Sequence, residues 1–389
     1  MKLIAAKVKQ AIGLLNELDI DAWLIVSRES NLMADPAMSM VVGHEVTWES
    51  FFVYTRSGRA MALVGNLDVD NFKRAEWFTD VATYTEGVGE NLRDLLAECD
   101  PKTLAVNYSV DDPAADGLTH GMYLALRDHL YSTPYADNLV SAENIVTKLR
   151  ARKLPDEIDL IRTAVEKANL AWQIVLPQLQ VGQTEREIAA LITHALSDLG
   201  VEPSFPTIVN AGDKTSPGHG VPTDARISAG DLLHVDFGAR YQGYCSDLQR
   251  LVYFQPSHLS APPDELSQAF DCVNSIITAT AAACKPGKKG KDIDQIARTM
   301  LGDEGYPEYQ HALGHQLGRA VHDGGALLGP KWPRYGKSPL ILLEENNIFT
   351  LELEIALPGI GCVGLEEDVR ITADRAEFLG PRQTELVVK

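Results

Sequence analysis

The sequence predicts an α/β protein built from two domains, and three observations support this prediction. The chain has 389 residues, 45% of them hydrophobic, which is enough for two domains of roughly 150 residues or more, each with its own core. Helical and strand patterns alternate along the first 150 residues, as in an α/β layer arrangement. A basic stretch with a proline, at 146–156, then interrupts the apolar pattern, so we place the domain boundary near residue 150.

The first domain is predicted to begin with a helix at 3–18, where apolar residues recur at three- and four-residue intervals. No His, Asp or Glu residues of this domain are clustered at a spacing that suggests chemistry. We therefore expect 1–150 to act as scaffold, substrate gate or interface. Further strand patterns follow at 22–27, 51–55, 60–64 and 103–107, and further helical patterns at 88–99 and 116–130.

The second domain is predicted to open on a long helix, because Pro155-Asp156-Glu157 supplies the proline and the acids that are typical of a first turn. Two more amphipathic helices are predicted at 184–199 and 264–283. Strand patterns occupy 231–239, 244–254, 348–354 and 361–372.

The charge balance limits the kinds of partner. The chain carries 35 Lys and Arg against 54 Asp and Glu, a formal charge of −19, which argues against a nucleic-acid or anionic-membrane partner because phosphates favour a basic face. Charged residues interrupt the early apolar run, so no signal peptide is expected, and no stretch approaches the roughly 20 apolar residues that span a bilayer. Five cysteines at scattered spacings fit reduced thiols. We therefore expect a soluble, cytoplasmic protein.

Asp236 and Asp247 stand in the two strands that flank a turn near Gln242-Gly243. If the turn is centred between 241 and 242, the two aspartates face each other, with Cβ atoms roughly 5 Å apart. Carboxylates this close repel each other unless a proton or a cation lies between them, and oxygen ligands suit manganese, magnesium or zinc. On these residues alone, two strand-end aspartates that face solvent are an equally good interpretation.

Three of the ten histidines, His311, His315 and His322, lie close together in the sequence among several glycines. His311 and His315 are four positions apart, which places them on one face of either a helix or a strand. A helical zinc-protease motif needs a glutamate directly after the first histidine, and Ala312 stands there instead. His219 lies in a loop rich in glycine and proline, a setting in which catalytic groups are common. Ordinary core or surface histidines are the alternative for all four.

The last two predicted strands carry acids within apolar runs, and a buried acid is costly unless it is paired or bound to a metal. We expect Glu354, Glu367 and Asp368 to be hydrated and to face outward. Strand alternation alone does not say which face points inward. Only the resemblance to a known family singles out Glu352 and Glu366 as the inward acids.

In chain order, these acids and histidines resemble the pita-bread metallopeptidases, which include prolidase (Xaa-Pro dipeptidase), aminopeptidase P and methionine aminopeptidase, together with creatinase. The resemblance covers 151–389 and extends loosely over 1–150. The family's paired-aspartate pattern appears as Asp236-Phe-Gly-Ala…Gly243-Tyr-Cys-Ser-Asp247-Leu-Gln-Arg250, and its histidine pattern as His311-Ala-Leu-Gly-His315-Gln-Leu-Gly…Val321-His322-Asp323. Its glutamate strands match Phe349-Thr-Leu-Glu352 and Leu365-Glu366-Glu367…Ile371-Thr372, and its upstream His-Gly matches His219-Gly220.

The resemblance implies a creatinase/prolidase-like α/β domain at 1–150, followed by a pita-bread (α+β) catalytic domain at 151–389, in a homodimer. It also implies two bound divalent ions, with Mn²⁺ as the first choice and Zn²⁺ or Co²⁺ as alternatives. A register shift of one residue would make Glu367 a ligand in place of Glu366. The implied metal ligands are Asp236, Asp247, His315, Glu352 and Glu366.

The implied activity is hydrolysis of the peptide bond before proline in a small peptide, by a hydroxide that bridges the two ions. Glu352 would carry the proton to the leaving amine, while His219, His311 and His322 would orient the peptide and donate hydrogen bonds. An Xaa-Pro dipeptidase is the first interpretation. Aminopeptidase P, which acts on longer Xaa-Pro peptides, is the alternative. A non-catalytic pita-bread binding module is a third, which the filled ligand positions argue against.

Two departures from the family pattern affect these expectations. Gly364 stands where prolidases often carry an arginine that receives the carboxylate of the dipeptide, which weakens the case for strict dipeptidase specificity. Arg370, Arg319 or an arginine of the first domain would have to substitute for it. Leu248-Gln249 also stand where Ile-Thr or a similar pair is usual.

Overall fold

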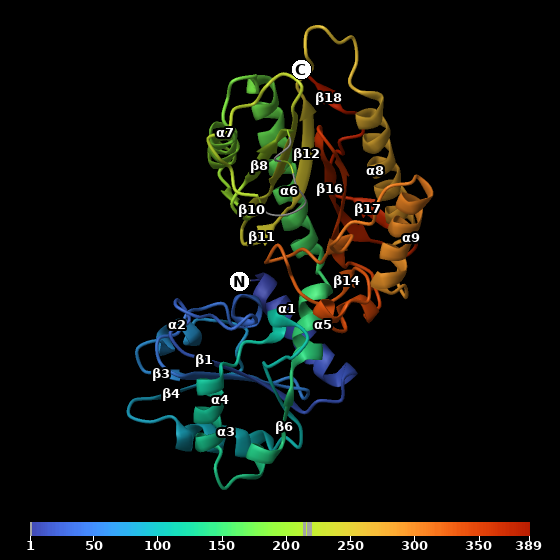
Figure 1. Cartoon of the computed structure of the whole chain (residues 1–389). Helices are drawn as coiled ribbons and strands as arrows, with labels where there is room; N and C mark the ends of the chain where they lie inside the picture. The colour runs from blue at the N-terminus through green and yellow to red at the C-terminus, as the bar shows by residue number, and fades with distance from the viewer. Residues whose placement is uncertain (1, 213–214, 216–219) are drawn as a thin grey trace. The chain divides into compact units, whose positions relative to one another are not determined.

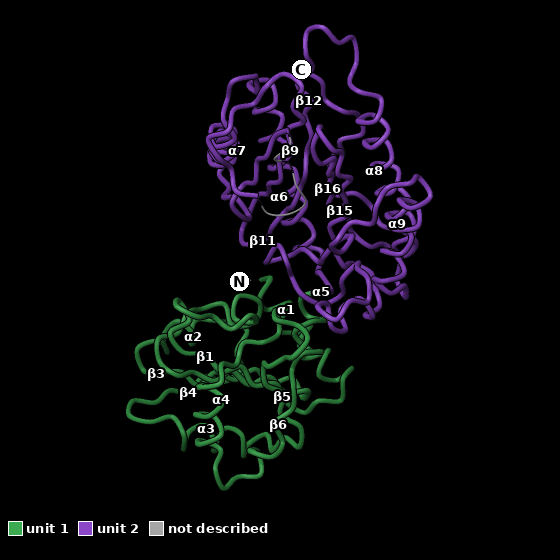
Figure 2. The backbone as a smooth tube through the Cα atoms, viewed as in Figure 1, with its two compact units in different colours: residues 1–150 green, residues 151–389 purple. Residues whose placement is uncertain are grey.

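The computed structural model of the chain describes residues 2–212, 215 and 220–389. It divides into two compact units, Met1–Arg150 and Ala151–Lys389, each with its own sheet and hydrophobic cores (Figure 2). Within the described residues, no helix is both long enough and apolar enough to cross a membrane.

The first unit contains a six-stranded sheet with strand order β4-β3-β2-β1-β5-β6 and helices on both faces (Figure 1). Its elements are α1 (Lys2–Glu17), β1 (Ala22–Ser27), η1 (Met38–Val42), β2 (Ser50–Thr55), β3 (Ala60–Gly65), α2 (Val69–Lys73), β4 (Asp80–Tyr84), α3 (Gly89–Cys99), β5 (Leu104–Val106), η2 (Pro113–Ala115), α4 (His120–His129), η3 (Pro134–Asp137), β6 (Leu139–Ser141) and α5 (Glu143–Ala151).

Strand β1 shows why this unit is layered. Trp23 and Ile25 pack into one core with α1, whereas Leu24 and Val26 pack into the other core with α3 and α4. A strand that is buried on both faces carries a continuous apolar run, which is the pattern that predicts β1. The other predicted elements of this unit also form, and the largest difference is that α4 begins only after Thr119, whose side chain caps the helix.

The second unit contains a seven-stranded sheet in which β15-β16-β12-β9-β8 are neighbours, β17 pairs with β16, and β18 pairs with β12. Its elements are α6 (Pro155–Val175), η4 (Leu176–Gln178), α7 (Glu185–Asp198), β7 (Glu202–Pro203), β8 (Ile208–Ala211), β9 (Leu232–Phe237), β10 (Ala239–Tyr241), β11 (Tyr244–Cys245), β12 (Leu248–Tyr253), α8 (Asp264–Ala283), α9 (Gly290–Asp303), β13 (Gly314–His315), β14 (Leu327–Leu328), η6 (Pro333–Tyr335), η7 (Ser338–Leu340), β15 (Ile348–Leu357), β16 (Gly361–Ile371), β17 (Ala376–Phe378) and β18 (Val387–Val388).

Two separate cores support the two halves of this sheet. Helices α6 and α7 pack with β8, β9 and β12, whereas α8 and α9 pack with β15 and β16 (Figure 1). Each half is therefore a pair of helices against part of one sheet, and the strands of both halves meet at the pairing of β12 with β16.

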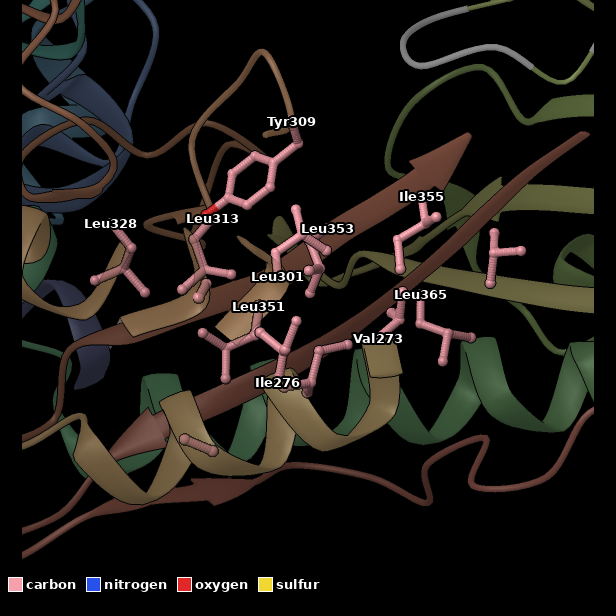
Figure 3. Packing of buried hydrophobic residues seen from close by; sticks show 14 of the residues in the cluster. Val273, Ile276, Leu301, Tyr309, Leu313, Leu328, Leu351, Leu353, Ile355 and Leu365 are labelled. Atoms are coloured by element: carbon pink, nitrogen blue, oxygen red, sulfur yellow. The ribbon is translucent and has the colours of Figure 1, made fainter. Parts of the chain in front are cut away.

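The core under β15 decides the orientation of the acids in that strand. Leu351, Leu353 and Ile355 point into the core formed with α8 and α9 (Figure 3). Fully burying such a side chain contributes about 1.5–3 kcal/mol, so the opposite register would lose several of these contributions and would bury acids instead. Because side chains alternate along a strand, Glu352 and Glu354 point away from this core.

Candidate metal centre

A row of polar side chains crosses the sheet of the second unit at one register. Asp236 of β9 pairs with Gln249 of β12, and Gln249 in turn pairs with Glu366 of β16. Glu366 then pairs with Glu352 of β15. Directly opposed residues lie about 5 Å apart across a strand pair, so the sheet brings together acids that are far apart in the sequence.

The predicted direct pairing of Asp236 with Asp247 is wrong, because the hairpin turns one residue later than assumed. Gln242 and Gly243, with φ angles of 48° and 81°, are the central residues of the turn, as in a type I′ hairpin. Asp236 therefore faces Gln249, and Asp247 lies diagonally across from it. As diagonal neighbours on one face of the hairpin, the two aspartates are nevertheless close enough for their side chains to interact.

His315 reaches this row from β13, a short strand that packs against β15. Its Nε2 atom lies 3.7 Å from Asp247 Oδ2 and 3.7 Å from Glu352 Oε1. It lies 4.0 Å from Glu366 Oε1, and possible ligand atoms of Asp247, His315 and Glu366 are all within 4.8 Å of one another. Gly314 permits this approach, since a Cβ atom there would lie 2.0 Å from a backbone oxygen of β15.

These acids are crowded together inside the protein. Three buried oxygens, Asp236 Oδ1, Asp247 Oδ1 and Glu366 Oε1, have no hydrogen-bond partner among the described residues. Burial, followed by the charge of neighbouring carboxylates, raises the pKa of Asp236 to about 8 and the pKa values of Asp247 and Glu366 well above their usual range. Burial also raises the pKa of Glu352 to about 7. Such oxygens fit a site in which cations take the place of protons.

The donor set fits divalent ions. Carboxylate oxygens and an imidazole nitrogen are ligands for Mn²⁺, Mg²⁺ and Zn²⁺. Asp236, Asp247, His315, Glu352 and Glu366, the residues that the resemblance implies, are the ones that would hold such ions.

Glu367 does not face solvent as expected, since its side chain is buried on the face of β16 opposite to Glu366. Arg250 binds both of its oxygens, with Nη1 at 3.2 Å from Oε1 and Nη2 at 3.1 Å from Oε2. The expectation fails because Arg250 and the backbone N–H of Gln383, 3.1 Å from Glu367 Oε1, cover this face of β16, and a buried acid needs such a cation as partner.

The same expectation is wrong for Asp368 and Glu354. Asp368 is buried and accepts a hydrogen bond from the backbone N–H of Asp247 at 3.0 Å. Glu354 is partly buried, with Oε1 at 3.1 Å from His311 Nε2. Both acids therefore belong to the surroundings of the candidate centre, because Asp368 contacts Asp247 and Glu354 contacts His311.

The predicted catalytic histidines have different environments. Burial alone would lower the pKa of His311, but the nearby carboxylates of Glu354 and Glu352 raise it to about 8. His322 is more exposed, and its ring meets that of His315 edge-on, with centroids 4.4 Å apart. His219 lies outside the described residues.

Two residues at this centre were missed by the sequence interpretation. Gln249 donates hydrogen bonds from Nε2 to Glu366 Oε2 at 2.9 Å and to Glu352 Oε2 at 3.3 Å. Its Oε1 atom lies 2.9 Å from His234 Nε2. The signal was a polar residue two positions from each aspartate and therefore on the same face of its strand, with Gln249 following Asp247 and His234 preceding Asp236.

The arginines considered as substitutes at position 364 have other contacts. Arg370 donates to Asn346 Oδ1 at 2.7 Å from Nη2 and lies 3.3 Å from Glu377 Oε1. The guanidinium of Arg319 lies over the ring of Tyr244, 4.8 Å from its centroid.

Known proteins with similar sequences and structures agree with this architecture. The family model for metallopeptidase family M24 matches residues 159–373. An Xaa-Pro dipeptidase of Pyrococcus horikoshii is 28% identical over 392 residues, covering 100% of both chains. The structure of an Xaa-Pro dipeptidase from Bacillus anthracis has a TM-score of 0.80 at 24% identity and covers 99% of this chain and 100% of that one. The structure of an X-Pro aminopeptidase from Thermotoga maritima has a TM-score of 0.76 at 25% identity, and the match covers 98% of this chain and 99% of that one.

These similarities confirm the predicted fold class, an N-terminal α/β domain followed by a C-terminal pita-bread domain. They also agree with the polar row, since a family of metallopeptidases requires a cluster of metal-binding side chains. The chain therefore belongs to metallopeptidase family M24 and is a metallopeptidase.

Proposed function

We propose that the chain is an Xaa-Pro dipeptidase that depends on two divalent ions and hydrolyses the peptide bond before proline. The observation that carries this proposal is the row of buried acids beside His315, in a chain that aligns over its full length with an Xaa-Pro dipeptidase. Mn²⁺ is the proposed ion, with Zn²⁺ or Co²⁺ as alternatives. A homodimer in the cytoplasm is part of the same proposal: the resemblance favours the homodimer, and the five cysteines at scattered spacings favour the cytoplasm.

The proposed roles follow from the positions and pKa values of the side chains. When bound, two divalent ions would supply a water of lowered pKa and would polarise the scissile carbonyl. The carboxylate of Glu352 lies beside the candidate metal centre, with Oε1 at 3.7 Å from His315 Nε2, so we assign to it proton transfer to the leaving amine. His311 is largely protonated at neutral pH, because its pKa is about 8, and is assigned with His322 and His219 to orienting the peptide.

The preference for proline has a chemical basis. The nitrogen of the scissile Xaa-Pro bond belongs to the proline ring and forms a tertiary amide without an N–H group, so a pocket need not supply an acceptor there. A pocket shaped for the ring can therefore favour Xaa-Pro bonds over ordinary peptide bonds.

Aminopeptidase P is the second candidate, and Gly364 favours it. A dipeptidase must bind the carboxylate of a short substrate, and position 364 provides no side chain for this purpose. An enzyme that releases one residue from longer Xaa-Pro peptides has no such need close to the scissile bond. The structural likeness to an X-Pro aminopeptidase is compatible with this alternative.

One reconstitution experiment tests both candidates. The protein is stripped of metal with a chelator and then supplied with Mn²⁺, Zn²⁺ or Co²⁺, together with Xaa-Pro dipeptides, Xaa-Pro tripeptides or Met-Ala peptides. We expect hydrolysis of the dipeptides to return with Mn²⁺. Faster cleavage of tripeptides would favour aminopeptidase P, and no hydrolysis with any ion would reject the enzyme proposal.

Two substitutions test the proposed ligands. Asp247→Ala and His315→Ala are expected to abolish activity while the circular dichroism spectrum is retained. His194→Ala and Asp198→Asn on α7 are matched controls, because both residues are exposed on a helix, and they should keep full activity. Activity retained in Asp247→Ala or His315→Ala would reject the proposed ligand set.

A further inference from the structure

Gln249 lies between the two glutamates of the polar row and a histidine. Its Nε2 atom is 2.9 Å from Glu366 Oε2 and 3.3 Å from Glu352 Oε2, and its Oε1 atom is 2.9 Å from His234 Nε2. The side chain is buried, with 8% of the residue exposed. A single carboxamide therefore contacts two acids on one side and an imidazole on the other.

The chemistry of these groups fixes the orientation of the amide. Carboxylates that bind a metal ion are ionised and only accept hydrogen bonds, so in the metal-bound site the NH₂ group of Gln249 must face Glu352 and Glu366. The carbonyl oxygen of the amide then faces His234, which must donate from Nε2–H. The hydrogen bonds run in one direction, from His234 through Gln249 to the glutamates.

This orientation separates the two oxygens of each glutamate. The Oε2 atoms of Glu352 and Glu366 are held by Gln249, whereas their Oε1 atoms lie 3.7 Å and 4.0 Å from Nε2 of His315. Glu366 Oε1 is also one of the buried oxygens without a partner among the described residues. Gln249 thus leaves one oxygen of each glutamate directed toward the candidate metal centre.

Gly364 provides the space for this arrangement. A Cβ atom at position 364 would lie 2.9 Å from Gln249 Oε1 and 3.1 Å from His234 Nε2. Real Cβ atoms rarely come this close to a neighbour, so even alanine would push on the amide and the imidazole. The glycine at 364 and the glutamine at 249 are therefore parts of one local structure.

We propose that Gln249, hydrogen-bonded to His234 and accommodated by Gly364, is a positioning residue that orients Glu352 and Glu366 for metal binding. This inference rests on the proposed function, because it concerns the same centre. Partners that hold the outer atoms of metal ligands fix the ligands' geometry, and their loss lowers metal affinity about 10- to 100-fold. It also explains why position 364 cannot carry a carboxylate-binding arginine here without displacing the amide.

The first test measures the affinity of the metal-free protein for Mn²⁺ by titration calorimetry, without any substrate. Gln249→Met keeps the length of the side chain but removes the donors, and we expect it to bind Mn²⁺ about 10- to 100-fold more weakly. Gln383→Met is the matched control, because Gln383 is also 8% exposed and instead hydrogen-bonds the backbone of Leu251. The control should keep wild-type affinity.

The second test asks whether Gly364 acts through the same amide. Gly364→Ala alone should weaken Mn²⁺ binding, whereas adding it to Gln249→Met should cause little further loss. In ¹⁵N-histidine spectra of the metal-free protein, the Nε2–H signal that disappears in His234→Ala should shift in both single variants. If Gln249→Met does not fold, Gln249→Glu replaces it as a variant of closely similar shape.

The outcomes separate the two proposals. Wild-type Mn²⁺ affinity in Gln249→Met, or independent losses that multiply in the double variant, would overturn the positioning role but leave the enzyme proposal intact. A wild-type protein that neither binds Mn²⁺ nor cleaves Xaa-Pro peptides would overturn both.

Discussion

Replacing Arg250 with methionine removes a cation buried directly behind the polar row. The Nη1 atom of Arg250 donates to the backbone oxygens of Gln249 and Glu366, at 2.9 and 3.1 Å. Together, its two terminal nitrogens bind both oxygens of Glu367, and Nη2 also donates to Asn169 Oδ1 at 3.1 Å. The guanidinium therefore joins β12, β16 and α6 at the point where the two halves of the sheet meet.

The expected loss of stability follows from these contacts. Methionine fills much of the volume of Arg250 but leaves the carboxylate of Glu367 buried without its guanidinium partner. Breaking a buried ion pair from one side costs about 3–5 kcal/mol, and unsatisfied neutral acceptors add to this. We expect a loss of about 5 kcal/mol, which lowers the Tm of this unit by about 10–20 °C at about 2–4 °C per kcal/mol. The deficit should shrink at acidic pH, where Glu367 becomes neutral.

Urea denaturation of the metal-free protein, monitored by circular dichroism, measures this loss. Arg162→Met is the matched control, because Arg162 pairs with Glu377 at 3.2 Å but the two side chains are 38% and 39% exposed. A pair this exposed is worth less than about 1 kcal/mol. If Arg250→Met loses no more stability than this control, the reasoning about the buried pair is refuted.

Two further predictions concern pH and the histidine loop. The folded protein raises the pKa of Asp236 from 3.8 to about 8, so the metal-free protein should lose stability as the pH rises toward 8, and Mn²⁺ should raise the Tm more at pH 8 than at pH 6. A metal-free Tm that rises between pH 6 and pH 8 would contradict this. Lys153→Met should cost about 3–5 kcal/mol, because Lys153 Nζ lies 2.9 Å from the buried carboxylate of Asp323, and it should raise the KM for Xaa-Pro peptides by loosening the loop beside His322. Unchanged stability and KM would show that this pair does not hold the loop.

Much of the fold could be predicted from periodicity. The helix at Asp264–Ala283 and the strand at Ala22–Ser27 form at the predicted residues, because their apolar patterns match helical and buried-strand spacing closely. The helix at Gly290–Asp303 was missed, since it follows a lysine- and glycine-rich segment that reads as a loop. The two long predicted strands at 231–254 are each broken in two, near Gly238, where a Cβ atom would lie 1.9 Å from the backbone oxygen of Ser246.

The candidate site could be predicted only in part. The family resemblance and the implied metal site both came from the types and the order of five residues, Asp236, Asp247, His315, Glu352 and Glu366. The cross-strand pairing of these residues could not be predicted from the sequence, because a turn that moves by one residue changes every cross-strand partner. The hairpin at Gln242-Gly243 shows this directly, since it places Gln249 opposite Asp236.

The sequence by itself determined the class of the protein, and it predicted a domain boundary near residue 150 and the kinds of side chain available for metal binding, because these depend on composition, periodicity and local order. Only the tertiary structure decided which acids meet. Leu351, Leu353 and Ile355 pack into the core, so Glu352 points away from it, and Arg250 binds Glu367 on the face of β16 opposite to Glu366. These choices depend on what packs against each strand, and that information lies in contacts between segments far apart in the chain.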